Sequence, residues 1–360
     1  MRLAHMDLTA KRILVTGGTG SLGKVLVRRL LAGEHGRPGK VIILSRDEAK
    51  QHEMRLAYQQ RRVGTDEVIY HNFTQILEFR IGDVRAYGDV AAAARDADII
   101  INAAALKQVP TCEYFPEQAI HTNCDGAANI VRAIRELSLP VEVVVGVSTD
   151  KACKPVNVMG MSKAIAERIF TAANVLNSRT RFVCVRYGNV MASRGSVLPL
   201  FHQQIRTGGP VTITAESMTR FLMTLDQAVD TVFEAIAHGA PGEIVIPTAP
   251  SASVINIARA LIGDRGTPIR ITGIRPGEKE HEILVSDEEC RHAFARGGYY
   301  AIAPMLPELA ALPSSDRLPL NREYSSADAP VDLERTAALL RENHLMLDQV
   351  DLAEATELLR

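Results

Sequence analysis

A glycine-rich turn near the N-terminus constrains the fold of this chain more than any other feature. The turn reads Thr16-Gly17-Gly18-Thr19-Gly20-Ser21-Leu22-Gly23, and it lies between a short apolar run and an amphipathic stretch. Glycines permit a tight turn and a close approach of the backbone to a ligand, and a helix N-terminus offers unpaired N–H groups to an anion. We therefore predict a strand, a pyrophosphate-binding loop and a helix at this point.

The N-terminal half alternates apolar, β-branched runs with longer amphipathic stretches. This pattern is typical of a parallel sheet with helices on both faces. The expected strands are Arg12–Thr16, Lys40–Leu44, Ile76–Ile81, Asp98–Asn102, Val141–Val147 and Arg181–Tyr187. The expected helices are Ser21–Leu31, Asp47–Arg61, Gly88–Ala94, Pro116–Leu137 and Val158–Leu176. The order predicts an α/β fold with a doubly wound parallel sheet, the Rossmann arrangement.

After about residue 190 the pattern loosens, and we expect a smaller C-terminal substrate-binding lobe. Residues 1–190 would form the dinucleotide-binding domain, and 225–247 would return to it. Residues 191–224 and 248–303 would form the second lobe, followed by a C-terminal arm and helix over 304–360. The elements expected here are helices Val197–Arg206, Asp226–Ala237, Ser253–Ile262 and Leu333–Asn343, and strands Val211–Thr214, Glu243–Pro247 and Ile269–Gly273.

Composition excludes several classes of function. The 41 basic and 42 acidic residues nearly cancel and are interspersed, so no basic field favours nucleic acid or an anionic membrane surface. The five cysteines lie far apart without a C-x-x-C pair, which favours a reducing compartment. No segment reaches the ~20 apolar residues of a membrane helix, and we expect a cytoplasmic protein. His281 and Glu282 lack metal-ligand spacing, so no metal is predicted.

The end of the second expected strand bears on the choice of cofactor. NAD-binding proteins usually carry an acid there, whereas this chain reads Ser45-Arg46-Asp47-Glu48. Arg46 favours a 2′-phosphate, with Ser45 and Lys50 as helpers, and NADP is therefore predicted over NAD. Asp47 keeps NAD open as the alternative, since an acid there can bind ribose or serve the helix dipole.

Further contacts to the dinucleotide are expected along the sheet edge. In the glycine-rich turn, the predicted contacts are Thr16, Gly17, Gly20, Ser21, Leu22 and Gly23. Asp83 and Val84 would meet the adenine, although Asp83 could equally cap the following helix. Ala103 and Ala104 would pass beneath the cofactor.

An acid and an amine stand together at the end of the fifth expected strand. Asp150 and Lys151 are followed by Met159 and Lys163 at the start of the next helix. A carboxyl and an amine can exchange protons with a substrate, but a thioether is only a weak acceptor. Taken alone, Asp150-Lys151 is also compatible with a strand-end turn whose charges are solvated.

Seven motifs occur in order between about residues 11 and 300. They are the glycine-rich turn, Ser-Arg-Asp-Glu (45–48), Ala-Leu-Lys-Gln-Val-Pro (105–110), Ser-Thr-Asp-Lys (148–151), Arg-Tyr-Gly-Asn-Val (186–190), Met-Thr-Arg-Phe (218–221) and Arg-Pro-Gly-Glu-Lys (275–279). In these motifs the chain resembles the extended short-chain dehydrogenase/reductase family, and within it the UDP-N-acetylglucosamine 4,6-dehydratases of bacterial surface-sugar biosynthesis. Met159 stands where most of that family carries tyrosine. The chain is most similar to the capsular-polysaccharide dehydratase/5-epimerase type, which also has methionine there.

The resemblance implies a reaction and roles for these residues. A hydride leaves C4 of the sugar for NADP, water is eliminated from C5 and C6, and the hydride returns to C6. Lys151 would take the C5 proton as a neutral amine, its pKa lowered by burial, by Lys163 and by the nicotinamide charge. Asp150 would protonate the leaving C6 hydroxyl. Thr149 would orient the C4 hydroxyl while Lys151 removes its proton, directly or through a water. Lys163 would hold the nicotinamide ribose, and the Asp-Lys pair implies inversion at C5.

The substrate site is implied in the same way. Asn189, Arg194, Arg220, Arg275 and Glu278 lie in the matching motifs and would bind UDP. Lys107 would reach cofactor or substrate, or be a surface lysine. The fold implies a homo-oligomer, a dimer or a hexamer. The segment Val63–Leu77 is longer than the family leads us to expect, and could be a surface loop or alter substrate or subunit contacts.

Three other functions stay open. A retaining 4,6-dehydratase would differ in the face from which the sugar is protonated. A UDP-sugar 4-epimerase would share the C4 oxidation but normally needs the tyrosine and no Asp-Lys pair. A protein that binds NADP as a regulatory signal would explain the missing tyrosine without catalysis, although the two lysines and the UDP motifs disfavour it.

Overall fold

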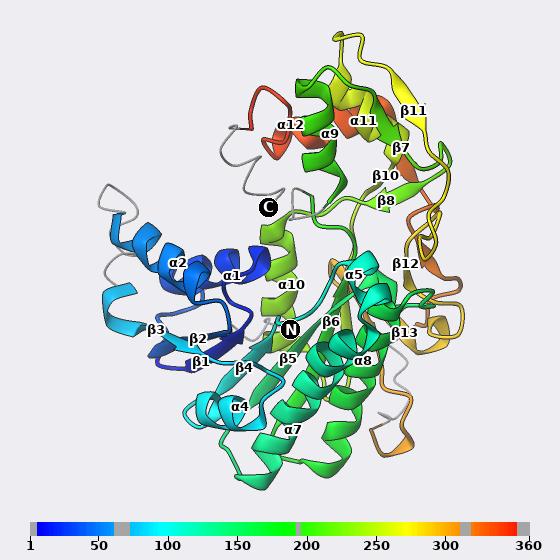
Figure 1. Cartoon of the computed structure of the whole chain (residues 1–360). Coiled ribbons are helices and arrows are strands. Elements are labelled where there is room, and N and C mark those ends of the chain that lie inside the picture. Colours follow the sequence, from blue (N-terminus) through cyan, green and yellow to red (C-terminus); the bar gives the residue numbers. More distant parts are fainter. Residues whose placement is uncertain (1–5, 61–72, 192–195, 310–317, 351–360) are drawn as a thin grey trace.

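The computed structural model describes residues 6–60, 73–191, 196–309 and 318–350. Most of the Val63–Leu77 segment and Arg194 fall outside these ranges. A large sheet covered by helices forms the main body, and a smaller lobe of helices and short strands lies beside it (Figure 1). None of the helices within the described ranges combines the length and apolarity needed to cross a membrane.

Nine strands form the central sheet, in the order β13-β14-β9-β6-β5-β4-β1-β2-β3. Their bounds are β1 (Arg12–Thr16), β2 (Lys40–Ser45), β3 (Leu77–Ile81), β4 (Ile99–Asn102), β5 (Val143–Thr149), β6 (Arg181–Tyr187), β9 (Ile244–Pro247), β13 (Ala293–Arg296) and β14 (Tyr299–Ile302). Strands β1 to β6 and β9 are parallel to their neighbours, and only the β14 and β13 edge is antiparallel. The predicted fold class is confirmed. The strand order reverses between β1 and β4, where such sheets bind their ligands.

Helices cover both faces of this sheet, with α1 and α10 packed together on one face and α4, α7 and α8 on the other (Figure 1). Their bounds are α1 (Ser21–Ala32), α2 (Glu48–Gln60), α4 (Tyr87–Ala94), α5 (Val109–Tyr114), α6 (Pro116–Ile120), α7 (Gly126–Glu136), α8 (Val158–Leu176) and α10 (Leu225–His238). The single helix predicted over Pro116–Leu137 was wrong in detail, because a π-helical turn at His121–Asp125 separates α6 from α7. The short helix α5 was not predicted. Proline restricts the residue before it, so Phe115 leaves the helical region and divides α5 from α6.

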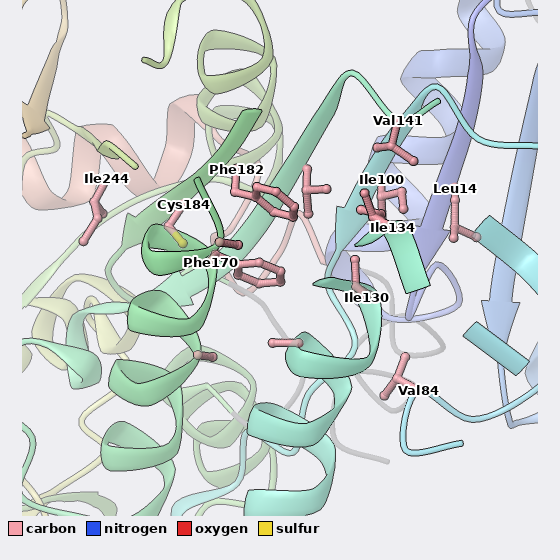
Figure 2. Packing of buried hydrophobic residues seen from close by; sticks show 14 of the residues in the cluster. Leu14, Val84, Ile100, Ile130, Ile134, Val141, Phe170, Phe182, Cys184 and Ile244 are labelled. Carbon is pink, nitrogen blue, oxygen red and sulfur yellow. The ribbon is translucent and has the colours of Figure 1, made fainter. Parts of the chain in front are cut away.

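The packing of α8 on β5 and β6 brings the start of this helix to the edge of the sheet. Figure 2 shows Phe170 of α8 beside Phe182 of β6 in the apolar cluster, and their ring centroids are 6.3 Å apart. Gly146 of β5 makes room for this contact, since a Cβ atom there would lie 2.5 Å from the Phe170 ring. The close approach of helix and strand fixes the position of Lys163, two turns before Phe170.

A third apolar cluster holds the smaller lobe together. Its elements are α9 (Val197–Arg206), β7 (Val211–Ile213), β8 (Thr219–Phe221), β10 (Ser251–Ser253), α11 (Val254–Ile262), β11 (Ile269–Ile271), β16 (Pro330–Val331) and α12 (Leu333–Glu342). A further pair, β12 (Ile283–Val285) and β15 (Tyr324–Ser325), leads from this lobe back toward the sheet. We predicted that residues 248–303 lie entirely in the smaller lobe. This prediction is wrong for β13 and β14, because both strands belong to the central sheet. Strand β9 pairs with β6, so 244–247 also lie in that sheet.

Candidate active site

The glycine-rich turn after β1 has a backbone that only glycine accommodates at two positions. Gly17 has a φ of 68°, and a Cβ atom on it would lie 2.8 Å from Ala104. A Cβ atom on Gly23 would lie 2.5 Å from the backbone of Gly18. Gly20 offers α1 no capping side chain, and the first turn of α1 holds no acidic residue. The N–H groups at the start of α1 therefore suit a pyrophosphate, with Ser21 and Leu22 in that first turn.

Other predicted cofactor residues gather where β1 and β4 end side by side. The Thr16 hydroxyl donates to Asn102 Oδ1 at 2.7 Å and accepts the Ala104 N–H at 3.2 Å. Ala103 donates its N–H to the Thr16 carbonyl, which joins the two strand ends. This is the point at which the strand order reverses, so the two alanines border the expected cofactor position.

After β2, Asp47 contacts Lys50 of the following helix α2, whereas Arg46 is directed toward Asp83. Asp47 Oδ1 accepts the Lys50 N–H at 3.0 Å, and Oδ2 lies 2.7 Å from Lys50 Nζ. The Ser45 hydroxyl pairs with that of Thr19 at 3.0 Å. Arg46 is 55% exposed, with only a 3.8 Å approach to Asp83. Asp47 thus contacts Lys50, and Arg46 is exposed after the strand.

The alternative assignment of Asp83 as a helix cap is wrong. Helix α4 begins after Ala86, without a side-chain cap. The Asp83 carboxylate instead accepts the Arg85 N–H at 3.0 Å and the Arg85 Nε–H at 2.8 Å. Val84 is buried beneath Gly126 of α7, where a Cβ atom would lie 2.9 Å from the valine.

The turn after β5 carries the proposed catalytic pair. Asp150–Ala152 form a 3-10 turn, and α8 starts at Val158 with Asn157 as its N-cap. The Asn157 carboxamide accepts the Gly160 N–H at 2.8 Å. A Cβ atom on Gly160 would lie 2.1 Å from the Lys151 carbonyl, so glycine lets the helix start press against the turn. The sequence thereby sets Lys151 and the first turns of α8 side by side.

Two buried carboxylates flank the Lys151 amine. Its Nζ lies 3.0 Å from Asp150 Oδ1 and 3.3 Å from Glu282 Oε1, and the Thr149 hydroxyl donates to the same Asp150 oxygen at 2.9 Å. The side chains of Asp150 and Glu282 are only 1% and 3% exposed. Asp150 Oδ2 and Glu282 Oε2 are buried without a hydrogen-bond partner among the described residues. One oxygen of each acid is thus open to a further donor.

The expected lowering of the Lys151 pKa is wrong for this structure. Burial does lower the pKa, as predicted, but the charges of Asp150 and Glu282 outweigh it and raise the pKa of Lys151 above its ordinary value. The surroundings of Lys151 in this structure therefore favour its protonated form.

Lys163 and Met159 occupy different surroundings on α8. Lys163 is buried, and burial lowers the pKa of its amine. No hydrogen bond or ion pair reaches that amine from the described part of the chain, so it is available to ribose hydroxyls of a nicotinamide cofactor. Met159 is 5% exposed and packs against Cys112 of α5 and Ala119 of α6. It fills the position with apolar volume and provides no acid or base.

The predicted substrate residues divide into two groups. Asn189 Oδ1 and Glu278 Oε2 are buried without a partner among the described residues, and Arg275 is 63% exposed and 3.9 Å from Glu278. Arg220 instead donates to the carbonyl groups of Thr219, Lys279 and Glu280, at 2.7 to 3.0 Å. Its guanidinium thus anchors the 279–282 segment to β8. Lys107 is exposed in the segment between β4 and α5.

The sequence reasoning missed Glu282 and Lys279 as neighbours of the Asp150–Ala152 turn. The Lys279 amine donates to the Cys153 carbonyl, and burial lowers the pKa of Lys279. Glu282 was considered only as a metal ligand. A buried role was signalled by its place directly before the apolar run Ile283–Val285, but its contact with Lys151 spans 131 positions.

A buried ion network lies behind the same turn. Arg186 of β6 contacts Glu167 of α8 and Glu289 beyond β12, each at 2.7 Å, and its side chain is 1% exposed. The Ser148 hydroxyl donates to Glu167 at 2.5 Å, and Cys153 Sγ lies 3.7 Å from Glu289. The network ties β5, β6 and α8 to the segment that follows Glu282. Within the described ranges, no group of three or more histidine, cysteine or acidic side chains is arranged to hold a metal ion.

Similarity to known proteins extends over most of the chain. The model of a family described as "Polysaccharide biosynthesis protein" matches residues 13–304. A relative from Rickettsia bellii named UDP-glucose 4-epimerase is 44% identical over 297 residues, covering 81% of this chain and 82% of the relative. One of the same name from Rickettsia felis is 41% identical over 356 residues, covering 97% and 95%.

Solved structures show the same fold. Pen from Bacillus thuringiensis superposes with a TM-score of 0.83 at 31% identity, over 95% of this chain and 100% of that one. A double mutant of DesIV, a dTDP-glucose 4,6-dehydratase from Streptomyces venezuelae solved with NAD bound, gives a TM-score of 0.63 at 22% identity, over 74% and 86%. The likeness to DesIV is one of fold alone.

Proposed function

This chain belongs to the polysaccharide biosynthesis protein family, and from that premise we propose that it is a UDP-N-acetylglucosamine 4,6-dehydratase with NADP as its cofactor. In the coarser sense it is an enzyme of the nucleotide-sugar dehydratase and epimerase class, with a nicotinamide cofactor. The observation that carries the finer proposal is the contact between Asp150 and Lys151 at 3.0 Å, in a chain whose residue 159 is a methionine that cannot act as a base. An acid in contact with an amine provides both the acid and the base that an elimination of water requires.

The residues present fit a nicotinamide dinucleotide. The glycine-rich turn and the open start of α1 suit its pyrophosphate, and Arg46 suits its 2′-phosphate. Lys163, which is buried and has no hydrogen-bond partner among the described residues, suits its ribose hydroxyls. When bound, the cofactor supplies the oxidant that makes a ketone at C4 and the reductant that later completes C6. The remaining chemistry consists of proton transfers, which fall to the protein.

The Asp150–Lys151 ion pair can generate both required protonation states at once. Transfer of one proton from Lys151 Nζ to Asp150 Oδ1, along their 3.0 Å hydrogen bond, leaves a neutral amine and a protonated acid. A site closed by the sugar favours this neutral form, because buried charges are costly. The raised pKa of Lys151 is therefore compatible with its role as a base.

In the elimination, each partner of the pair then has one task. The C5–H bond breaks, its proton goes to the Lys151 amine, and its electron pair forms the C5–C6 double bond. The C6–O bond breaks, and the hydroxyl leaves as water with the proton of Asp150. We propose inversion at C5, as the Asp-Lys pair implies, and Thr149 as the group that orients the C4 hydroxyl for its earlier oxidation.

An epimerase is the second candidate, because the Rickettsia relatives carry that name. Epimerisation at C4 keeps the C6 hydroxyl, so it gives the acid at position 150 no leaving group to protonate. Mass spectrometry of UDP-N-acetylglucosamine incubated with the enzyme and NADP distinguishes the two. We expect a product lighter by one water, whereas an isomer of unchanged mass would support the epimerase and contradict the dehydratase.

The NADP preference is tested by Arg46→Ala. Loss of a charge-assisted contact should weaken NADP binding by about tenfold to a hundredfold and leave NAD binding unchanged. Isothermal titration of both cofactors measures this, with Arg95→Ala as a control, since Arg95 is an exposed arginine at the end of α4. Equal weakening for both cofactors, or none for NADP, would contradict the assignment.

A further inference from the structure

Glu282 is rigidly placed against the catalytic lysine. Its N–H donates to the Ser326 hydroxyl at 2.9 Å, and its carbonyl accepts the Ser326 N–H at 2.8 Å. The next residue, Ile283, pairs with Ser325 in the β12–β15 ladder. These backbone contacts hold the carboxylate 3.3 Å from Lys151 Nζ. The acid therefore comes from the smaller lobe but is fixed at the edge of the central sheet.

Charged side chains of both signs surround Lys151. Asp150 and Glu282 are acidic, and Arg220 and Lys279 are basic. Arg220 Nε lies 3.7 Å from the same Glu282 oxygen that faces Lys151. When Asp150 holds the proton destined for the leaving hydroxyl, Glu282 is the anion that remains beside the amine among the described residues.

We propose that Glu282 is a positioning residue for dehydration: it holds the Lys151 amine at the Asp150 carboxyl and stabilises the ammonium that forms as the amine takes the C5 proton. The inference rests on the proposed function. Positive charge develops on Lys151 as the C5–H bond breaks, and a fixed anion at 3.3 Å lowers the energy of that charge. The proton stays on Lys151, and Glu282 itself forms and breaks no bond with the sugar.

The test compares Glu282→Gln, which removes the charge and keeps the shape, with Glu282→Asp, which keeps the charge on a shorter side chain. Glu280→Gln is the matched control, because Glu280 is an exposed acid two positions away. Each variant is assayed with NADP and UDP-N-acetylglucosamine for turnover, for KM and for the near-ultraviolet absorbance of reduced cofactor. Thermal unfolding and NADP binding report on the fold.

For Glu282→Gln we expect turnover about a hundredfold below wild type, with KM and NADP binding little changed. Because C4 oxidation precedes the impaired step, reduced cofactor should accumulate during turnover. Glu282→Asp should retain intermediate turnover, and Glu280→Gln should match the wild type. If Glu282→Gln fails to fold, the Asp variant must still show lowered turnover with accumulated reduced cofactor.

Two results would overturn the inference. One is wild-type turnover in the Gln variant, or in the Asp variant if Gln does not fold. The other is a loss of turnover without accumulation of reduced cofactor, which indicates a purely structural role. Both leave the proposed function intact, provided that the wild type dehydrates the sugar. A wild type that yields only an isomer of unchanged mass would reject the proposed function and this inference together.

Discussion

Replacing Lys151 by methionine is expected to lower the turnover of UDP-N-acetylglucosamine by about a hundredfold to ten-thousandfold. The amine is the base assigned to the C5 proton, and its contacts at 3.0 and 3.3 Å hold it between Asp150 and Glu282. Methionine has a similar length and no basic group, so it keeps much of the packing and removes the proton transfer. Cofactor binding should persist, because the glycine-rich turn and Lys163 are unchanged.

The measurement is the rate of product formation beside the dissociation constant for NADP. Lys154→Met is the matched control on the same turn, since Lys154 points to Asp287 and Glu323 at 2.6 and 2.9 Å rather than to the Asp150 pair. The control should keep most of its turnover. Undiminished turnover in Lys151→Met would remove the lysine from the mechanism, and an equal loss of NADP binding would assign it a structural role instead.

Replacing Arg186 by methionine is expected to lower the free energy of unfolding by about 3 to 5 kcal/mol. The guanidinium is enclosed by Glu167 and Glu289 and also donates to the Leu284 carbonyl at 2.9 Å. Its removal leaves the two buried carboxylates without the cation that contacts both. Denaturant titration at neutral pH measures the change, with Arg132→Met as the control, because Arg132 and Glu136 form an exposed pair on α7 that should matter far less.

The same substitution should have a characteristic pH dependence. Burial raises the pKa of Glu289, but the hydrogen bonds and charge of Arg186 outweigh this and leave the pKa below its ordinary value. In the wild type this carboxylate therefore stabilises the fold above pH ~4.3, the ordinary pKa of glutamate, and the stabilisation is lost as the pH falls through the lowered pKa. In the variant the acids can be buried in neutral form at low pH, so the difference in stability should narrow on acidification. A pH-independent difference would contradict the ion network as its cause.

The parts of the fold that the sequence predicted are those specified by local patterns. Strands Arg12–Thr16 and Arg181–Tyr187 and helices Val158–Leu176 and Val197–Arg206 have the predicted bounds. Each strand contains an uninterrupted apolar run, Ile13–Val15 or Phe182–Val185, and each helix follows a capping or turn residue, so neighbours in sequence decide the outcome.

What could not be predicted depends on contacts between distant residues. The pKa of Lys151 was expected to fall because of burial, Lys163 and the nicotinamide charge. Asp150 and Glu282 raise it instead, and Glu282 lies 131 positions away in the sequence. Strands β13 and β14 are short and pair with each other, and they join the central sheet through the pairing of β14 with β9. Such pairings are set by the packing of the whole domain and leave little local pattern.

The most direct test of the central claim, that Asp150 and Lys151 carry out an elimination, is proton NMR of UDP-N-acetylglucosamine incubated with the enzyme and NADP in deuterated water. We predict a new C6 methyl signal without coupling to C5, because C5 takes deuterium from solvent while the hydrogen returned to C6 comes from C4. The configuration at C5 should be inverted. A product that keeps its C6 hydroxymethyl group and differs only at C4 would contradict the account.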